Sequence, residues 1–176
     1  HDVTSFAASA TLERNEEGPL EAPPPAPPPP GGAPPHAHAC AIVAGEVHCW
    51  GRSDFGALCT GLFDVERLPA HAPIIGKAWP QQLAVGDEIT CARMTDGSIQ
   101  CCGAEHRGRL GVGFSPLFIP VEAFEGHAVQ VATSHRAICA LVKDGRVECW
   151  GSNQYGELGQ GTTDEAAHPN PVKISF

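Results

Sequence analysis

The chain has 176 residues and a formal net charge of −9, with 11 Lys and Arg against 20 Asp and Glu. Contacts to nucleic acid or to anionic lipid headgroups need clustered Lys and Arg, so this charge argues against both partners. No run approaches the ~18 consecutive apolar residues that a membrane-spanning helix requires. We therefore expect neither a nucleic-acid-binding protein nor a membrane span.

The N-terminal part of the chain is rich in proline, with Pro23–Pro25, Pro27–Pro30 and Pro34–Pro35. Such runs favour the polyproline II conformation and offer little apolar surface to bury. We predict that residues 1–39 form a disordered, Pro-rich linker that serves as a spacer rather than as a ligand for proline-recognising domains.

Three short hairpins follow, over residues 40–49, 91–101 and 139–149. Each has apolar residues on both sides of an Ala-Gly or Asp-Gly pair, which is the strongest local hairpin signal. A further short apolar run precedes the second and third hairpins, and another follows each unit. No such run lies directly before Cys40, so the first unit is expected to begin at its hairpin.

A glycine-rich block follows each hairpin and is written three times without gaps: WGRSDFGALCTG at 50–61, CGAEHRGRLGVG at 102–113 and WGSNQYGELGQG at 150–161. A unit that recurs about every 50 residues indicates an architecture in which each unit stacks on its neighbour. About four short strands per unit, with glycine turns between them, are typical of a β-propeller blade. The sequence predicts an all-β fold.

The repeated pattern resembles the RCC1-like repeat (regulator of chromosome condensation). The resemblance is carried in the third unit by Val131, Ala132, His135, Cys139, Ala140, Leu141, Asp144, Gly145, Val147, Trp150, Gly151, Asn153, Tyr155, Gly156, Leu158, Gly159 and Gly161. The second unit departs at Cys102, where the others have tryptophan, and the first at Cys59, where the others have glycine. The family usually closes a ring of about seven blades, whereas this chain holds three units, over about 40–90, 91–138 and 139–176. The resemblance therefore implies a partial propeller or a piece of a longer protein.

Six of the eight cysteines face each other across the hairpins. Counting outward from each turn pairs Cys40 with Cys49, Cys91 with Cys101, and Cys139 with Cys149, and the one-residue change in spacing between units matches the change in turn length. Directly opposed residues of this kind are close enough for a disulfide. Buried free cysteines and a zinc site are the alternatives, although no metal-ligand spacing is present. Three disulfides predict an oxidising compartment, namely the extracellular space, the cell surface or the periplasm.

The two remaining cysteines lie where the repeat is broken. Cys59 and Cys102 are predicted to form a bridge between the first two units, provided that the two glycine blocks approach each other. Disulfides set the chain apart from nuclear and cytosolic relatives and point toward a secreted type. The Ala, Pro and Gly bias favours a bacterial source.

No catalytic, cofactor or metal site is predicted. His36 and His38 share one strand face, but two ligands do not make a metal site, and His36 and His135 occupy equivalent repeat positions that favour a structural role. His106, His127 and His168 fall in variable loops and are expected to be solvated. No nucleophile is placed beside a base, and the glycine blocks lack the phosphate-loop pattern. Trp50 and Trp150 are expected in the core.

The remaining candidates are surface residues. Phe114, Leu117 and Phe118 are unusually apolar for a loop, and they either contact a partner or pack over the neighbouring blade. We predict a non-catalytic protein–protein interaction module whose partner is an unknown protein, with self-association or further blades at the open propeller edges. The alternatives are the repeat region of a larger enzyme, or a propeller that acts as a guanine-nucleotide exchange factor or an enzyme inhibitor.

Overall fold

The structure is a computed structural model, and it describes residues 3–8 and 37–176 except 54, 64, 106, 112 and 135. The described residues form twelve strands and no helix, arranged as three four-stranded antiparallel sheets. The predicted all-β propeller fold with about three blades is therefore confirmed. None of the described segments is a helix that would be long and apolar enough to cross a membrane.

The strands of the first sheet are β1 (Val3–Ala8), β2 (His38–Val43), β3 (Glu46–Gly51) and β4 (Glu66–Ala72). Those of the second are β5 (Pro80–Gly86), β6 (Ile89–Met94), β7 (Ile99–Gly103) and β8 (Ser115–Pro120). Those of the third are β9 (Ala128–Thr133), β10 (Ala137–Val142), β11 (Val147–Asn153) and β12 (Asp164–Lys173).

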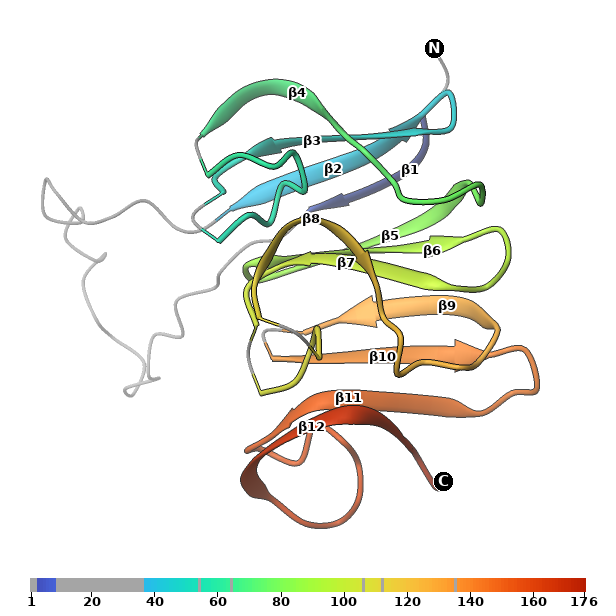
Figure 1. Ribbon diagram of the computed structural model, residues 1–176. Helices are drawn as coiled ribbons and strands as arrows, with labels where there is room; N and C mark the ends of the chain where they lie inside the picture. The colour runs from blue at the N-terminus through green and yellow to red at the C-terminus, as the bar shows by residue number, and fades with distance from the viewer. Residues whose placement is uncertain are drawn as a thin grey trace, which may run out of the picture.

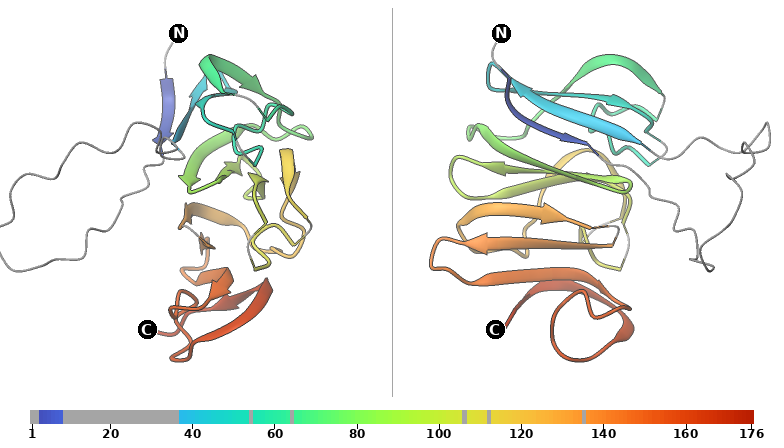
Figure 2. Two further views of the ribbon diagram at one scale, coloured as in Figure 1. Left: turned by 90° about the vertical axis from the view of Figure 1, so that its left-hand side faces the viewer. Right: turned by 180° about the vertical axis from the view of Figure 1, so that it is seen from behind.

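The three sheets lie one above the next as blades of an incomplete ring (Figure 1). Within each blade the strands follow chain order, and the first strands β1, β5 and β9 of neighbouring blades contact each other. The hairpin turns after β2, β6 and β10 lie together at one end of the blades, on the right in Figure 1. The glycine blocks after β3, β7 and β11 lie at the opposite end, and Figure 2 shows the same order of blades from the side and from behind.

A glycine in the last part of each third strand explains why the pair Trp-Gly or Cys-Gly recurs. Gly51, Gly103 and Gly151 all have φ near +110°, between 108° and 114°. A Cβ atom on them would lie 2.6, 2.1 and 2.5 Å, respectively, from a backbone carbonyl oxygen of the connection before the second strand. Only glycine combines this φ with so close an approach, so the repeat pattern at these positions is dictated by the backbone.

The structure differs from the predicted linker at its N-terminal end. Residues Val3–Ala8 form β1, which pairs with β2 in the register Phe6↔Ala41 and Ala8↔Ala39. The proline-rich segment is therefore an insertion between the first two strands of the first blade, at a place where the other blades have a short connection. The sequence did not reveal this strand because its partner lies some 30 residues further along the chain, with no turn signal beside it. Residues 9–36, including the proline runs and His36, lie outside the described residues.

Two buried clusters hold the blades together. One contains residues of the first and second blades, among them Leu58, Met94 and Phe118. The other contains residues of the second and third blades, among them Phe124 and Trp150. We call these the first and the second junction. Trp150 is fully buried, as predicted, whereas Trp50 is only half-buried, since its side of the first blade has no preceding blade among the described residues.

Candidate protein-interaction surface

All eight cysteines are paired in the structure. Cys40 and Cys49, Cys91 and Cys101, and Cys139 and Cys149 are directly opposed in the β2–β3, β6–β7 and β10–β11 ladders, each with a Cα–Cα distance of 4.1 Å and a disulfide. A fourth disulfide joins Cys59 to Cys102 with a Cα–Cα distance of 5.5 Å. The pairs are those expected from the hairpin registers and from the two breaks in the repeat.

The Cys59–Cys102 disulfide lies beside other contacts between the first glycine block and the second blade. Thr60 forms a β-bridge with Leu117, and the backbone N–H of Gly61 donates to Pro116 O at 2.9 Å. Cys59 itself has φ +57°, in the left-handed region that its glycine equivalents also occupy. The first glycine block is therefore fixed to the second blade by a covalent bond to β7 and by backbone pairing with β8, which makes this part of the surface rigid.

Four large apolar side chains are exposed around this contact, and we call them the apolar patch. The patch consists of Leu62, Phe63, Phe114 and Leu117, which are 56%, 55%, 58% and 42% exposed. The rings of Phe63 and Phe114 meet edge to face, with centroids 5.7 Å apart. Clustered exposed apolar groups on a rigid frame mark sites of protein association, whereas single exposed apolar residues do not.

The prediction of a contact surface at Phe114, Leu117 and Phe118 needs one correction. Phe118 is fully buried in the first junction, so it is a core residue and does not belong to the surface. Leu117 and Phe118 are neighbours on β8 and therefore point to opposite faces. Phe63 was missed by the sequence reasoning, although two adjacent large apolar residues in a glycine-rich loop were a usable signal.

A polar contact between blades lies close to this surface. His38 is buried, and its Nε2 atom is 2.8 Å from Thr90 Oγ1. The Thr90 hydroxyl in turn donates to Ala57 O at 2.8 Å, so His38, Thr90 and Ala57 form a continuous polar contact between the first two blades. Burial lowers the pKa of His38 to about 4, so this histidine is a neutral structural group rather than a metal ligand.

The other histidines offer no site either. His127 is exposed, as expected for a loop residue. His168 was expected to be solvated, but it lies half-buried on β12 and its Nε2 atom is 2.8 Å from Asp164 Oδ1. Hydrogen bonds from Asn153 and His168 lower the pKa of Asp164 to about 2. His106 and His135 lie outside the described residues, and within the described part of the chain no three His, Cys, Asp or Glu side chains are placed to hold a metal ion.

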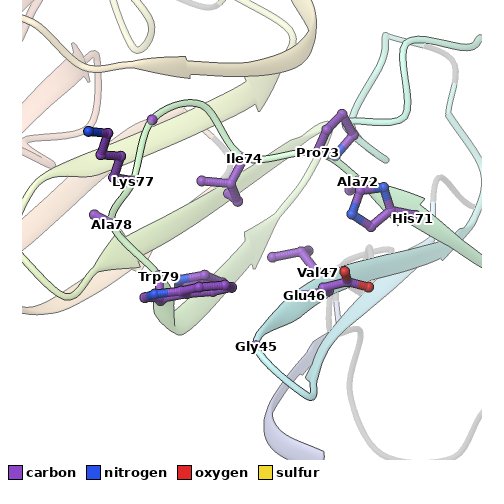
Figure 3. Close-up of a pocket in the computed structure, with 12 residues that line it drawn as sticks. Gly45, Glu46, Val47, His71, Ala72, Pro73, Ile74, Lys77, Ala78 and Trp79 are labelled. Carbon is purple, nitrogen blue, oxygen red and sulfur yellow. The ribbon is translucent and has the colours of Figure 1, made fainter.

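A cavity of about 440 Å³ lies at the other end of the first junction (Figure 3). Its floor is apolar and includes Val47, Ala72 and Ile74, and the ring of Trp79 forms one wall. Trp79 is 62% exposed although it is the largest side chain of the connection between β4 and β5. Glu46, His71 and Lys77 surround the cavity with polar groups. The sequence reasoning did not select Trp79, and a lone tryptophan before a proline gave no motif to select it by.

The comparisons with known proteins agree with the repeat pattern. Two family models of the regulator of chromosome condensation (RCC1) repeat match the chain, one over residues 144–176 and the other over residues 128–157. No curated protein matches the chain in sequence. The third unit is therefore similar to an RCC1 repeat, as the spaced pattern around Trp150 indicated.

Solved structures show the same fold. Yeast RCC1 (Prp20), in a crystal structure with Kap60, has a TM-score of 0.68 at 23% identity, with 79% of this chain and 33% of that chain covered. Human WBSCR16 has a TM-score of 0.66 at 20% identity, with 79% and 37% covered. Prp20p from Saccharomyces cerevisiae, studied for its binding to Gsp1p and histones, has a TM-score of 0.68 at 18% identity, with 79% and 36% covered. The chain thus spans about a third of the length of these similar structures.

Proposed function

We propose that this chain is a non-catalytic protein-interaction module that binds a protein partner through the apolar patch. The observation that carries the proposal is the exposure of four large apolar side chains on a frame held by the Cys59–Cys102 disulfide. Preformed, rigid surfaces bind with a smaller entropic cost than flexible loops do. Aromatic anchors such as Phe63 and Phe114 are the groups that dominate the energetics of many protein interfaces.

The propeller fold supports this role by analogy. Yeast Prp20, whose fold is similar, is described in complex with Kap60 and as binding Gsp1p and histones. The net charge of −9 makes a nucleic-acid partner unfavourable for this chain. We take the partner to be a protein whose contact surface is largely apolar.

We further propose that the protein works outside the reducing cytosol. Four disulfides in a chain of this size are typical of proteins from the extracellular space, the cell surface or the periplasm. Peptide mapping without reduction, on protein isolated from its source, should return four linked peptide pairs. Free thiols at these positions would contradict the proposed compartment. The bacterial source suggested by the composition stays a prediction.

The interaction is tested by a double substitution in the patch, Phe63→Ser with Phe114→Ser. Partners captured by the unchanged protein from its native compartment are identified, produced separately, and titrated against each variant by calorimetry. We expect the double variant to weaken binding at least 100-fold, which is the loss of two well-packed anchors. The matched control is Tyr155→Ser, since Tyr155 is a 78% exposed aromatic residue in the glycine block of the third blade.

The control should bind like the unchanged protein, and all variants should retain the circular dichroism and unfolding midpoint of the unchanged chain. Equal affinities for the double variant and the unchanged protein would show that the apolar patch is not the binding surface. Turnover of the partner by the unchanged chain would contradict the non-catalytic role.

A further inference from the structure

The cavity beside Trp79 has an equivalent at the second junction, and the two are filled differently. The strand registers show which residues correspond at the two places. In the first blade Val47 is opposite Ala72. In the second blade Ile99 and Val121 are the corresponding pair, and the Val121 N–H donates to Ile99 O at 2.9 Å. The connections that lead to the next blade correspond as well, because they make matching hydrogen bonds. The Thr95 N–H donates to Trp79 O at 2.8 Å, and the Lys143 N–H donates to His127 O at 2.9 Å. Trp79 and His127 thus hold the same position before the first strand of the next blade.

At the second junction an aromatic side chain of the chain itself fills this space. Phe124 comes from the connection between β8 and β9, is only 7% exposed, and packs in one cluster with Ile99 and Val121. Its ring stacks on that of Trp150, with centroids 5.7 Å apart and planes 23° apart. The fold therefore provides a place for a phenyl ring between adjacent blades.

At the first junction three of the equivalent residues around this space are smaller, although Met94 is larger than its equivalent Val142. Val47 stands in the place of Ile99, Ala72 in the place of Val121, and Cys102 in the place of Trp150. The connection from β4 to β5 carries Ile74, which is only partly buried, and no phenylalanine. The result is the open cavity of about 440 Å³ with Trp79 as one wall.

Glycine in the first hairpin turn keeps the tryptophan ring in place beside the cavity. Gly45 has φ +84°, and a Cβ atom there would lie 3.3 Å from Trp79 Cε3. The ring therefore packs against the turn on one side and leaves its remaining surface to the cavity and to solvent. In Figure 3 Glu46 and His71 lie across the cavity from Trp79, while the ammonium group of Lys77 lies at the opposite side of the view.

We propose that this cavity binds an aromatic side chain, in particular a phenylalanine, presented by a partner polypeptide. The bound ring occupies the space that Phe124 fills at the second junction and contacts Trp79, while Glu46 and Lys77 meet polar groups of the flanking backbone. The apolar floor of Val47, Ala72 and Ile74 matches a hydrocarbon ring better than the hydroxyl groups of a sugar, which favours an aromatic side chain over a carbohydrate. The site is separate from the apolar patch, which lies at the glycine-block end, so the two proposals can fail independently.

The test uses a small probe and the indole N–H of Trp79 in a ¹H–¹⁵N nuclear magnetic resonance spectrum. N-acetyl-phenylalaninamide is titrated into the full chain, with N-acetyl-alaninamide and methyl glucoside as comparison probes. We expect a saturable shift of the Trp79 indole signal with a Kd of about 1–10 mM, in the range of a single-side-chain anchor. The alanine probe and the glucoside should bind at least tenfold more weakly.

Two variants exchange the properties of the junctions. Ala72→Val with Ile74→Phe reproduces the filling of the second junction and should abolish the response while the rest of the spectrum is kept. Phe124→Ala opens the second junction, so the Trp150 indole signal should begin to respond to the phenylalanine probe. The Phe63→Ser, Phe114→Ser variant should bind the probe as the unchanged chain does, because the apolar patch is elsewhere.

A Trp79 signal that does not move, or that moves equally with all three probes, would overturn the proposal. The proposal would also fail if the Trp79 signal of the filled variant, Ala72→Val with Ile74→Phe, responded to the phenylalanine probe as the unchanged chain does. Should the filled variant not fold, the appearance or absence of a response at Trp150 in Phe124→Ala decides the same question.

Discussion

The two junctions of this propeller join equivalent blades by different means. Between the second and third blades, Trp150 and Phe124 stack in an apolar cluster, and the Trp150 Nε1–H donates to Arg109 O at 3.0 Å. Between the first and second blades, the tryptophan position is Cys102, which is bonded to Cys59. At this position the first junction has a disulfide in place of the stacked tryptophan, together with a buried polar contact between His38 and Thr90.

The two breaks in the repeat belong together. A cysteine at the tryptophan position removes a large buried ring, and a cysteine at the glycine position places a side chain in the left-handed conformation, which costs about 1–2 kcal/mol. Neither change is favourable alone. Together, Cys59 and Cys102 form a disulfide that links the two blades, and the missing tryptophan ring leaves room for the cavity beside Trp79.

The largest effect is expected at the second junction, from Trp150→Ala. Trp150 is fully buried and stacked, so truncation should lower the free energy of unfolding by about 3–5 kcal/mol. Urea unfolding followed by circular dichroism measures the change. Trp50→Ala is the matched control, and its loss should be clearly smaller because Trp50 is only half-buried. Equal losses would show that the second junction does not depend on this ring.

At the first junction, Cys59→Ala with Cys102→Ala should destabilise the chain by up to about 4 kcal/mol, since the bridge closes a loop with a sequence separation of 43. Cys59→Gly with Cys102→Ala removes the same bridge but relieves the backbone at φ +57°. We expect this second variant to lose about 1 kcal/mol less. Chemical unfolding of both variants gives the difference, and the opposite order would refute the strain at Cys59.

His38 makes the first junction sensitive to pH. Its pKa is about 4 in the folded chain and near 6.5 in the unfolded chain, so between these values only the unfolded chain binds the proton. Stability should therefore fall as the pH drops from about 6.5 to 4, by about 3 kcal/mol in total. Urea unfolding at several pH values tests this.

His38→Gln should flatten that pH dependence because the glutamine amide can hydrogen-bond Thr90 as donor or acceptor without titrating. His127→Gln, at an exposed histidine, should keep the slope of the unchanged chain. A slope that survives in His38→Gln would assign the effect to another group.

The smallest effect concerns the face of the third blade that meets no neighbour among the described residues. Leu141 and Val147 are half-exposed there, whereas Ile138 and Val142 are buried against the second blade. We expect weak self-association that Leu141→Lys removes, measured by light scattering at two protein concentrations. A monomer at both concentrations in the unchanged chain would show that this face does not associate.

The repeat, the hairpin registers and therefore the blade fold could be predicted from the amino-acid sequence. These follow from local rules, since a glycine turn sets which residues are opposed and thereby places Cys139 across from Cys149. The same local counting explains why three of the disulfides were predictable from spacing alone. The bridge between Cys59 and Cys102 was also suggested by the sequence, because both residues interrupt the same repeat.

Features that depend on contacts between distant segments could not be predicted in this way. The strand β1 finds its partner some 30 residues away, so no local signal marked it. Phe118 and Leu117 are equally apolar in the sequence, yet one is buried and the other exposed, because which face of β8 meets the first blade is set by blade stacking. The cavity beside Trp79 depends on the summed volumes of side chains from two blades, a quantity that emerges only when those blades are packed together.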